Sequence, residues 1–176
     1  MNKYYSLKNI TELNEYLQVY IPLVNLFLKH YSLDLKQYNL LVDHIGVQML
    51  NSDDFDQITE QLNTYSTLIK VKEIHNRRNG IFKLNTEFIV NGLLIPSIEI
   101  FEPKPDFPPS QLRLGIEHIA FYTDSISYDS LLAYFKQNQL PIDKEGEFSK
   151  GSKFFKTTFI NGVEIEFRND ELINVA

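Results

Sequence analysis

Two short stretches of this chain share one residue pattern. DHIGV (Asp43 to Val47) and EHIAF (Glu117 to Phe121) each consist of an acid, a histidine, an isoleucine, a small residue and a bulky apolar residue. Both lie in segments that alternate apolar and polar residues, which is the period of a β-strand. An internal repeat of this kind predicts a fold built from two copies of one supersecondary unit.

The elements around each stretch also come in the same order. The first half predicts a strand, a helix and three more strands, over residues 40–50, 52–65, 68–74, 81–90 and 93–103. The second half predicts the same order over residues 115–123, 127–139, 142–148, 153–160 and 163–169. Asn91-Gly92 and Asn161-Gly162 separate the last two strands of each set, as short turns commonly do. We therefore predict an α+β fold of two βαβββ modules.

The segments outside the modules predict a helical extension and a linker. Apolar residues recur at helical spacing from about Thr11 to Tyr31, and Pro22 interrupts them, which predicts two short helices or one bent helix. The proline-rich segment 104–113 cannot continue a strand and predicts a linker. The expected boundaries are 1–39 for the extension and 40–176 for the domain, with module one over 40–103 and module two over 114–170.

The composition excludes several classes of protein. With 43% hydrophobic residues the chain is typical of folded globular domains, and without cysteine any metal must be held by nitrogen and oxygen atoms. The absence of cysteine fits a reducing cytoplasm, where we expect the protein. A net charge of −6 disfavours a nucleic-acid partner, and no apolar run predicts a membrane span or a secretory signal. We expect a small-molecule ligand, and the oligomeric state stays open.

Alternation along the four strands that carry the motifs sorts their side chains into two faces. One face is apolar and is expected to lie under the helices: Ile45, Val47, Met49, Ile98, Ile100, Ile119, Phe121, Val163, Ile165 and Phe167. The other face carries the imidazoles and carboxylates, with their neighbours: His44, Gly46, Gln48, Ser97, Glu99, Phe101, His118, Ala120, Tyr122, Glu164, Glu166 and Arg168. If the sheet curls, this second face lines a cavity. Its nitrogen and oxygen atoms suit Zn²⁺, Ni²⁺, Mn²⁺, Fe²⁺ or Co²⁺.

A second interpretation of this face needs no function. An antiparallel sheet with one face in water alternates apolar and polar residues in any case. However, each module has a histidine in its first strand and a glutamate in its last strand. This repeated placement favours a site.

The same segments resemble a known superfamily. DHIGV, SIEIFEP, EHIAF and NGVEIEF, at corresponding strands of a repeated βαβββ order, are similar to the vicinal-oxygen-chelate superfamily of glyoxalases, epimerases and ring-cleaving dioxygenases. The metal ligands that the resemblance implies are His44, Glu99, His118 and Glu166. Glu164 shares a face with Glu166, so which of the two completes the set stays open. The extension and the run NRRNGIFKLN are most similar to the YecM group, which implies this fold and metal binding but no particular reaction.

Three functions are compatible with such a site. The first is a metal-dependent lyase or isomerase that acts on a small oxo- or hydroxy-acid, with Glu99 or Glu166 as the catalytic base. The second is a non-haem iron dioxygenase, which would use only His44, His118 and Glu166. The third is a module that binds a small molecule or a metal without catalysis. A carboxylate in the fourth strand favours the lyase or isomerase.

Three further residues are expected to contact the substrate. Gln48 and Tyr122 fall on the cavity face, where each is predicted to orient a substrate oxygen or simply to line the cavity. Arg78 lies beside Arg77 in a predicted turn, where it is expected to bind an anionic group of the substrate through two hydrogen bonds. A solvated arginine without function is the other interpretation.

Overall fold

The computed structural model describes residues 9–74, 76–103, 105, 115–149 and 151–172. Its elements are α1 (Ile10–His30), β1 (Leu41–Gln48), α2 (Ser52–Tyr65), β2 (Ser66–Ile74), β3 (Arg77–Val90), β4 (Leu93–Phe101), β5 (Gly115–Tyr122), α3 (Ser125–Gln137), β6 (Lys144–Ser149), β7 (Ser152–Thr158), the 3-10 turn η2 (Ile160–Gly162) and β8 (Glu164–Arg168). This order confirms the predicted α+β class, with a helix preceding two βαβββ modules.

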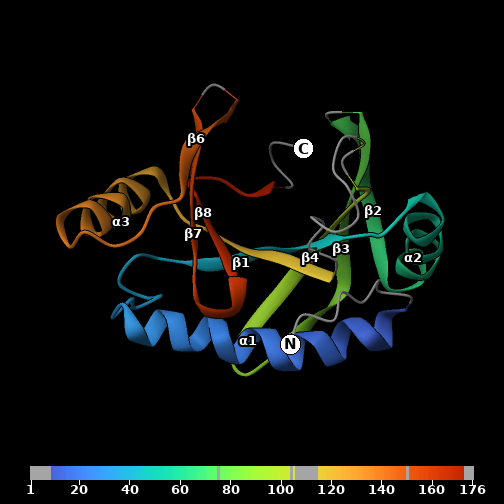
Figure 1. The fold of residues 1–176 in the computed structure, drawn as a ribbon, viewed down its shortest axis with the longest axis horizontal. Helices are drawn as coiled ribbons and strands as arrows, with labels where there is room; N and C mark the ends of the chain where they lie inside the picture. Colours follow the sequence, from blue (N-terminus) through green and yellow to red (C-terminus); the bar gives the residue numbers. More distant parts are fainter. Residues whose placement is uncertain (1–8, 75, 104, 106–114, 150, 173–176) are drawn as a thin grey trace.

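All eight strands belong to one mixed sheet, in the order β2-β3-β4-β1-β5-β8-β7-β6. Within each module the first strand pairs with the last in parallel, β1 with β4 and β5 with β8, and the modules join through the antiparallel pair β1 and β5. The sheet curls without closing (Figure 1). α2 and α3 lie outside its two rising arms, and α1 crosses beneath its base.

α1 is one helix of 21 residues, so of the two predicted outcomes, two short helices or one bent helix, Pro22 does not produce the division into two. Asn9 caps its start, because the side-chain oxygen accepts a hydrogen bond from the backbone N–H of Glu12 at 2.9 Å. Pro22 lies on the exposed side of the helix. Proline removes one backbone donor, and on this side water can take the place of that donor.

α1 holds both modules. The hydroxyl of Tyr20 donates to the backbone carbonyl of Glu164 in β8 at 2.9 Å, and the amide of Asn25 donates to the carbonyl of Asn91 at the β3–β4 turn at 3.2 Å. Its inward residues belong to the main core: Leu13, Leu17, Ile21, Val24, Phe27 and Leu28. The extension is therefore an integral support of the sheet.

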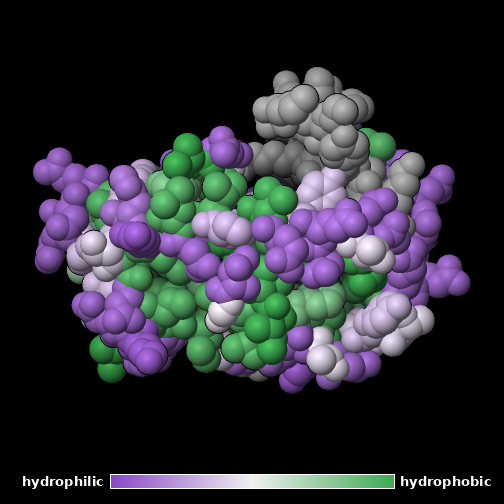
Figure 2. Space-filling view, turned by 90° about the horizontal axis from the view of Figure 1, so that it is seen from below, coloured by the Kyte–Doolittle hydropathy of each residue, from purple (hydrophilic) through white to green (hydrophobic). Residues whose placement is uncertain are grey.

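The predicted apolar face is confirmed. All ten residues assigned to it are buried in the main hydrophobic core. Seen from below, the outer face around α1 mixes polar and apolar side chains (Figure 2). α1 itself has two exposed large apolar residues, Val19 and Leu26. None of the described helices is long and apolar enough to cross a membrane.

One turn is shorter than predicted. β2 ends at Ile74 and β3 begins at Arg77, so Arg77 and Arg78 belong to a strand and not to a loop. Their side chains therefore point to opposite faces of the sheet. The predicted linker over 104–113 lies outside the described residues, apart from Pro105.

Candidate metal centre

The two histidine motifs meet at the centre of the sheet. In the antiparallel pair of β1 and β5, Ile45 is opposite Ile119, which makes this pair the midpoint of a local twofold arrangement. Each histidine is then opposite the small residue of the other motif: His44 faces Ala120, and His118 faces Gly46. The repeated small residue thus makes room for the imidazole of the opposite repeat.

Gly46 shows how tight this room is. A Cβ atom built on Gly46 would overlap the ring of His118, lying only 2.6 Å from its Nε2 atom. Side chains larger than hydrogen therefore cannot occupy this position unless the His118 ring moves. The glycine fixes where that imidazole lies.

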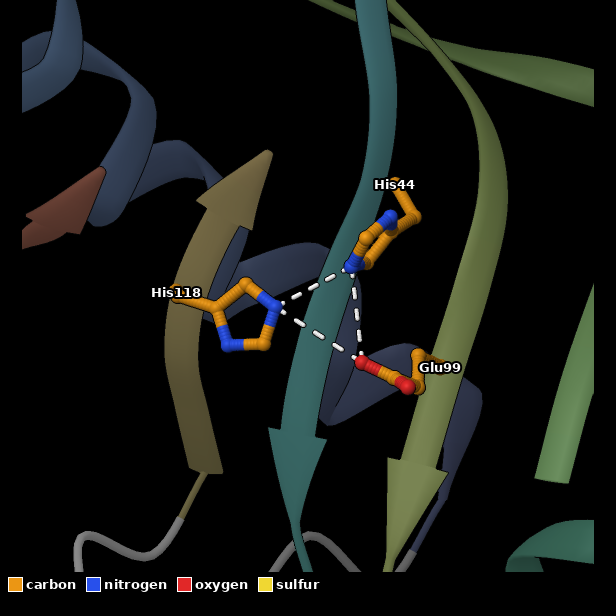
Figure 3. A group of neighbouring side chains, drawn as sticks. All are labelled: His44, Glu99 and His118. Atoms are coloured by element: carbon orange, nitrogen blue, oxygen red, sulfur yellow. Dashed lines mark hydrogen bonds and ion pairs between the residues drawn. The ribbon is translucent and has the colours of Figure 1, made fainter. Parts of the chain in front are cut away.

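His44, His118 and Glu99 form the candidate ligand group, which Figure 3 shows on three adjacent strands. The parallel register of β1 and β4 places Glu99 beside Gly46. The Nε2 atom of His44 lies 3.0 Å from the Nε2 atom of His118 and 3.4 Å from Oε2 of Glu99. The Nε2 atom of His118 lies 3.7 Å from the same oxygen. The three ligand atoms all lie within 4.8 Å of one another.

Asp43 orients His44 through an irregularity in β1. The pairing with β5 shifts register between Val42 and His44, which leaves Asp43 as an extra residue, and a bulge of this kind re-aims side chains. Oδ2 of Asp43 lies 2.8 Å from Nδ1 of His44. An ionised carboxylate only accepts hydrogen bonds, so Nδ1 carries the proton and Nε2 faces the group.

Glu99 is also held in place. The side-chain amide of Asn79 donates to Oε1 of Glu99 at 2.8 Å, so the other carboxylate oxygen is the one that faces the two histidines. Asn79 lies on β3, the neighbour of β4, and is buried. Each end of this hydrogen bond therefore comes from a strand and not from a loop, which favours a fixed geometry.

The electrostatics of the group favour one positive charge at its centre. Burial opposes protonation of His44, but hydrogen bonds and charges from Asp43 and Glu99 raise its pKa to about 9. Burial and the charge of Lys156 hold the pKa of His118 well below its ordinary value. Although burial acts the other way, hydrogen bonding and charge from His44 lower the pKa of Glu99.

This donor set fits a divalent metal ion. Two imidazole nitrogens and one carboxylate oxygen converge, and each is a lone-pair donor once His44 gives up its Nε2 proton. Asp43 supplies the carboxylate behind a ligating histidine that metal sites commonly have. The nitrogen and oxygen lone pairs that bind a proton in this group are the same lone pairs that a metal ion would bind.

The group opens into a cavity of about 630 Å³ between the arms of the sheet. Glu99 and His118 form part of its wall. Basic residues from both modules also line it: Lys72, Arg77, Lys144, Lys156 and Arg168. The acidic residues of the wall are Glu99, Glu117, Glu147 and Glu166, and Phe101, Phe148 and Phe154 provide aromatic surface. The cavity therefore suits a small ligand with anionic groups.

Glu166 lines this cavity but does not belong to the ligand group. Its register opposite Ala120 mirrors that of Glu99 opposite Gly46. However, Oε2 of Glu166 lies 2.9 Å from Nζ of Lys156, and Oε1 lies 3.4 Å from Nη1 of Arg168. Its carboxylate is thus bound by two cations.

The same lysine binds the neighbouring acid, because Nζ of Lys156 also lies 2.9 Å from Oε1 of Glu164. Neither glutamate of β8 therefore joins the histidines in this structure. The position of Lys156 corresponds to that of Ile81 in module one, since these residues pair with Glu166 and Glu99 respectively.

The three predicted substrate residues lie outside the cavity wall formed by the described residues. Gln48 is buried, and its amide donates to the carbonyl of Met49 at 3.4 Å. Burial and Glu171 raise the pKa of Tyr122 to about 12. Arg78 points toward α2, where it binds Asp56, and it also binds Glu102, which follows β4. Its neighbour Arg77 faces the cavity instead.

Comparison with solved structures shows that the chain shares its fold with methylmalonyl-CoA epimerases and with a structural-genomics protein. The structural-genomics protein EC4020 matches with a TM-score of 0.76 and 18% identity, covering 99% of this chain and 95% of that one. Streptomyces coelicolor methylmalonyl-CoA epimerase, in complex with 2-nitronate-propionyl-CoA, matches with a TM-score of 0.52 and 20% identity over 73% and 95%. Mycobacterium tuberculosis methylmalonyl-CoA epimerase matches with 0.53 and 13% over 77% and 91%.

Within this fold, the sequence itself places the chain more narrowly. Residues 9–137 match the model of the YecM protein family, so the chain belongs to the YecM family. No curated protein matches the sequence.

Proposed function

We propose that this protein binds a divalent metal ion through His44, Glu99 and His118 and uses it as a lyase or isomerase on a small oxo- or hydroxy-acid. The observation that carries the proposal is the convergence of three ligand atoms from three adjacent strands, two of which belong to residues of a cavity wall, Glu99 and His118. The resemblance in fold to the two methylmalonyl-CoA epimerases supports the reaction class.

The residues of the cavity would divide the work. A bound divalent ion acts as a Lewis acid that favours negative charge on a coordinated substrate oxygen. Lys156 and Arg168, which also line the cavity, would favour the same charge. We assign the proton transfer to Glu166, because among the cavity carboxylates outside the ligand group it is the one whose register in the sheet mirrors that of Glu99. When an anionic substrate binds, Lys156 would form an ion pair with the substrate in place of Glu166. The released carboxylate of Glu166 would then act as the base.

A second candidate function is a non-haem iron oxygenase. The observation that favours it is the composition of the group, because two histidines and one carboxylate are the ligands that such enzymes use. The carboxylate would be Glu99 and not Glu166.

Metal content and two reaction assays separate these candidates. We expect the purified wild-type protein to hold one divalent ion per chain, and His44→Ala or His118→Ala to lose it while still unfolding cooperatively. Full metal content in the double variant would contradict the proposed centre.

The reaction class is tested on protein loaded with Zn²⁺, Ni²⁺ or Fe²⁺. We expect exchange of the α-proton of 2-oxo acids for solvent deuterium, followed by NMR, and no oxygen uptake with catechols when iron is bound. Rapid oxygen uptake would support the oxygenase, and metal binding without either reaction would support a binding module. Glu166→Gln should lose the exchange but retain the metal.

A further inference from the structure

Arg77 is the first residue of β3 and faces the cavity with Asn79 and Ile81, which follow it at alternate positions. The side chain of Arg78 points to the opposite face, toward α2. Adjacent arginines thus have different environments, and only Arg77 is placed to contact a ligand in the cavity.

The guanidinium of Arg77 has few partners. Its Nη1 donates to the backbone carbonyl of Glu102 at 3.3 Å, while its buried Nε has no hydrogen-bond partner. Among the described residues, no carboxylate lies within ion-pair distance of it, although the charges of Glu117 and Glu99 act on it from further away. Buried donors usually have an acceptor, so the unpartnered N–H of Arg77 can donate a hydrogen bond to a ligand.

The other cations near the metal centre differ in this respect. Lys156 is bound by Glu164 and Glu166, and Arg168 by Glu166 and Asp170. Each is already opposed by carboxylates of the protein itself. The Nε atom of Arg168 also has no hydrogen-bond partner, but Arg168 is already paired with carboxylates. Arg77 is the guanidinium of the described cavity wall without a carboxylate at ion-pair distance, and it is therefore better suited to an external anion.

Arg77 is also fixed relative to the ligand group. Its Cζ atom lies 4.6 Å from the centroid of the Phe101 ring, and that ring stacks on His118 with centroids 6.2 Å apart and planes tilted by 11°. The stack of guanidinium, phenyl ring and imidazole sets a constant spacing between the two sites. A ligand that spans them would be selected by its length as well as its charge.

We propose that Arg77 binds a second anionic group of the ligand, so that this protein takes small diacids and not monoacids. The first group of the diacid would bind at His44, Glu99 and His118, and that half of the inference rests on the proposed function. The second group, a carboxylate or a phosphate, would accept hydrogen bonds from Arg77. Arg77 is thus a specificity residue of the cavity.

The first test uses metal-free protein and does not depend on the proposed function. Inorganic phosphate is titrated into wild type, Arg77→Gln and Lys83→Gln, and binding is followed by NMR. Lys83→Gln is the matched control, because this substitution also removes one positive charge from β3. Lys83 lies outside the cavity wall. We expect Arg77→Gln to weaken phosphate binding about tenfold or more. Equal binding by all three proteins would overturn the inference.

The second test uses zinc-loaded protein and pairs of acids of equal chain length. Malate is compared with 2-hydroxybutanoate, and 2-hydroxyglutarate with 2-hydroxypentanoate, by calorimetric titration. We expect one of the diacids to bind about tenfold or more tightly than its monoacid partner in wild type and Lys83→Gln, and this preference to disappear in Arg77→Gln. Zinc binding with equal affinity for diacid and monoacid would overturn the inference. If the wild-type protein does not bind zinc but still binds phosphate through Arg77, the proposed metal centre is overturned and Arg77 remains an anion site.

Discussion

Asp43 has a role at the centre although it is not a ligand. Because it holds the proton of His44 on Nδ1, we expect Asp43→Asn to reduce metal affinity by about 10- to 100-fold. The asparagine can still accept the hydrogen bond from the backbone N–H of Leu172, which Asp43 receives at 3.1 Å, so the fold should be retained. Calorimetric titration with Zn²⁺ measures the change.

The second repeat provides the control. Glu117 occupies the position of Asp43, but Nδ1 of His118 has no hydrogen-bond partner. Glu117→Gln should therefore leave metal affinity within about twofold of wild type. Equal losses in the two variants would mean that both acids act through overall charge, and not by orienting one imidazole.

Gly46 gives a second prediction at this scale. Gly46→Ala should displace the His118 ring and weaken Zn²⁺ binding by at least about tenfold, because a ligand moved by a fraction of an ångström loses its geometry. Gly146→Ala is the control, since its Cβ would meet only the ring of Phe154, at 3.1 Å. Unchanged zinc affinity in Gly46→Ala would show that His118 is not a ligand.

Strand alternation predicts a large part of this group but not all of it. His44, Glu99 and His118 lie in strands in which apolar and polar residues alternate clearly. The structure brings these three residues together. Alternation does not predict the role of Asp43, because it assigns Asp43 to the face opposite His44. The bulge in β1 turns the side chain toward the imidazole instead. The pairing of Glu166 with Lys156 depends on the register between β7 and β8, which one sequence does not reveal.

Among the elements, β3 is joined to α2 by Arg78. Its guanidinium binds Glu102 at 2.7 Å and Asp56 at 2.6 Å and lies over the ring of Phe55. Partial burial acts the other way, but hydrogen bonds from Arg78 lower the pKa of Glu102 from 4.5 to about 2. This pair should therefore stabilise the fold at neutral pH.

A depressed carboxylate pKa contributes stability above the unfolded-state value and loses it on acidification. We expect the contribution of Glu102 to be complete above about pH 5 and to disappear between about pH 4.5 and 2. Its size should be on the order of 1 kcal/mol, because Arg78 is partly exposed and solvent screens the pair. Urea unfolding of wild type and Glu102→Gln across this range measures it. A difference between the two that stays constant with pH would contradict the assignment.

The elements themselves were predictable where the apolar period was regular, as in the strands around both motifs. Pro22 does not divide the helix, because a proline on the exposed side of a long amphipathic helix costs one hydrogen bond and the packing of the opposite side compensates for it. The polar residues around Arg77 and Arg78 predict a turn and obscure the strand. Their alternate facing became visible only with the pairing of β2 and β3.

Across the whole molecule, the two modules are alike in backbone and different in charge. Ile81 and Lys156 occupy corresponding positions beside Glu99 and Glu166. Lys156→Ile would make the second half copy the first and release Glu166 from its ammonium partner. We expect this variant to be less stable without metal and to gain a larger increase in Tm on addition of Zn²⁺ than wild type.

Adding Glu166→Gln to Lys156→Ile identifies the cause. If the released carboxylate becomes a fourth ligand, the double variant should return to the Tm increase of wild type. If Lys156→Ile alone shows no larger increase, Lys156 is not what keeps Glu166 away from the ion.

The placement of the ligand group across the β1–β5 junction determines when it forms. His44 and His118 are separated by 74 positions in the chain and come from different modules, so the group cannot exist until both modules have folded and joined. Contacts that span such long loops usually form late on the folding path. A bound metal ion would therefore lower the unfolding rate and leave the folding rate unchanged. Its stabilisation would then appear as a longer lifetime of the native state, and newly made chains would fold at the same rate with or without the ion.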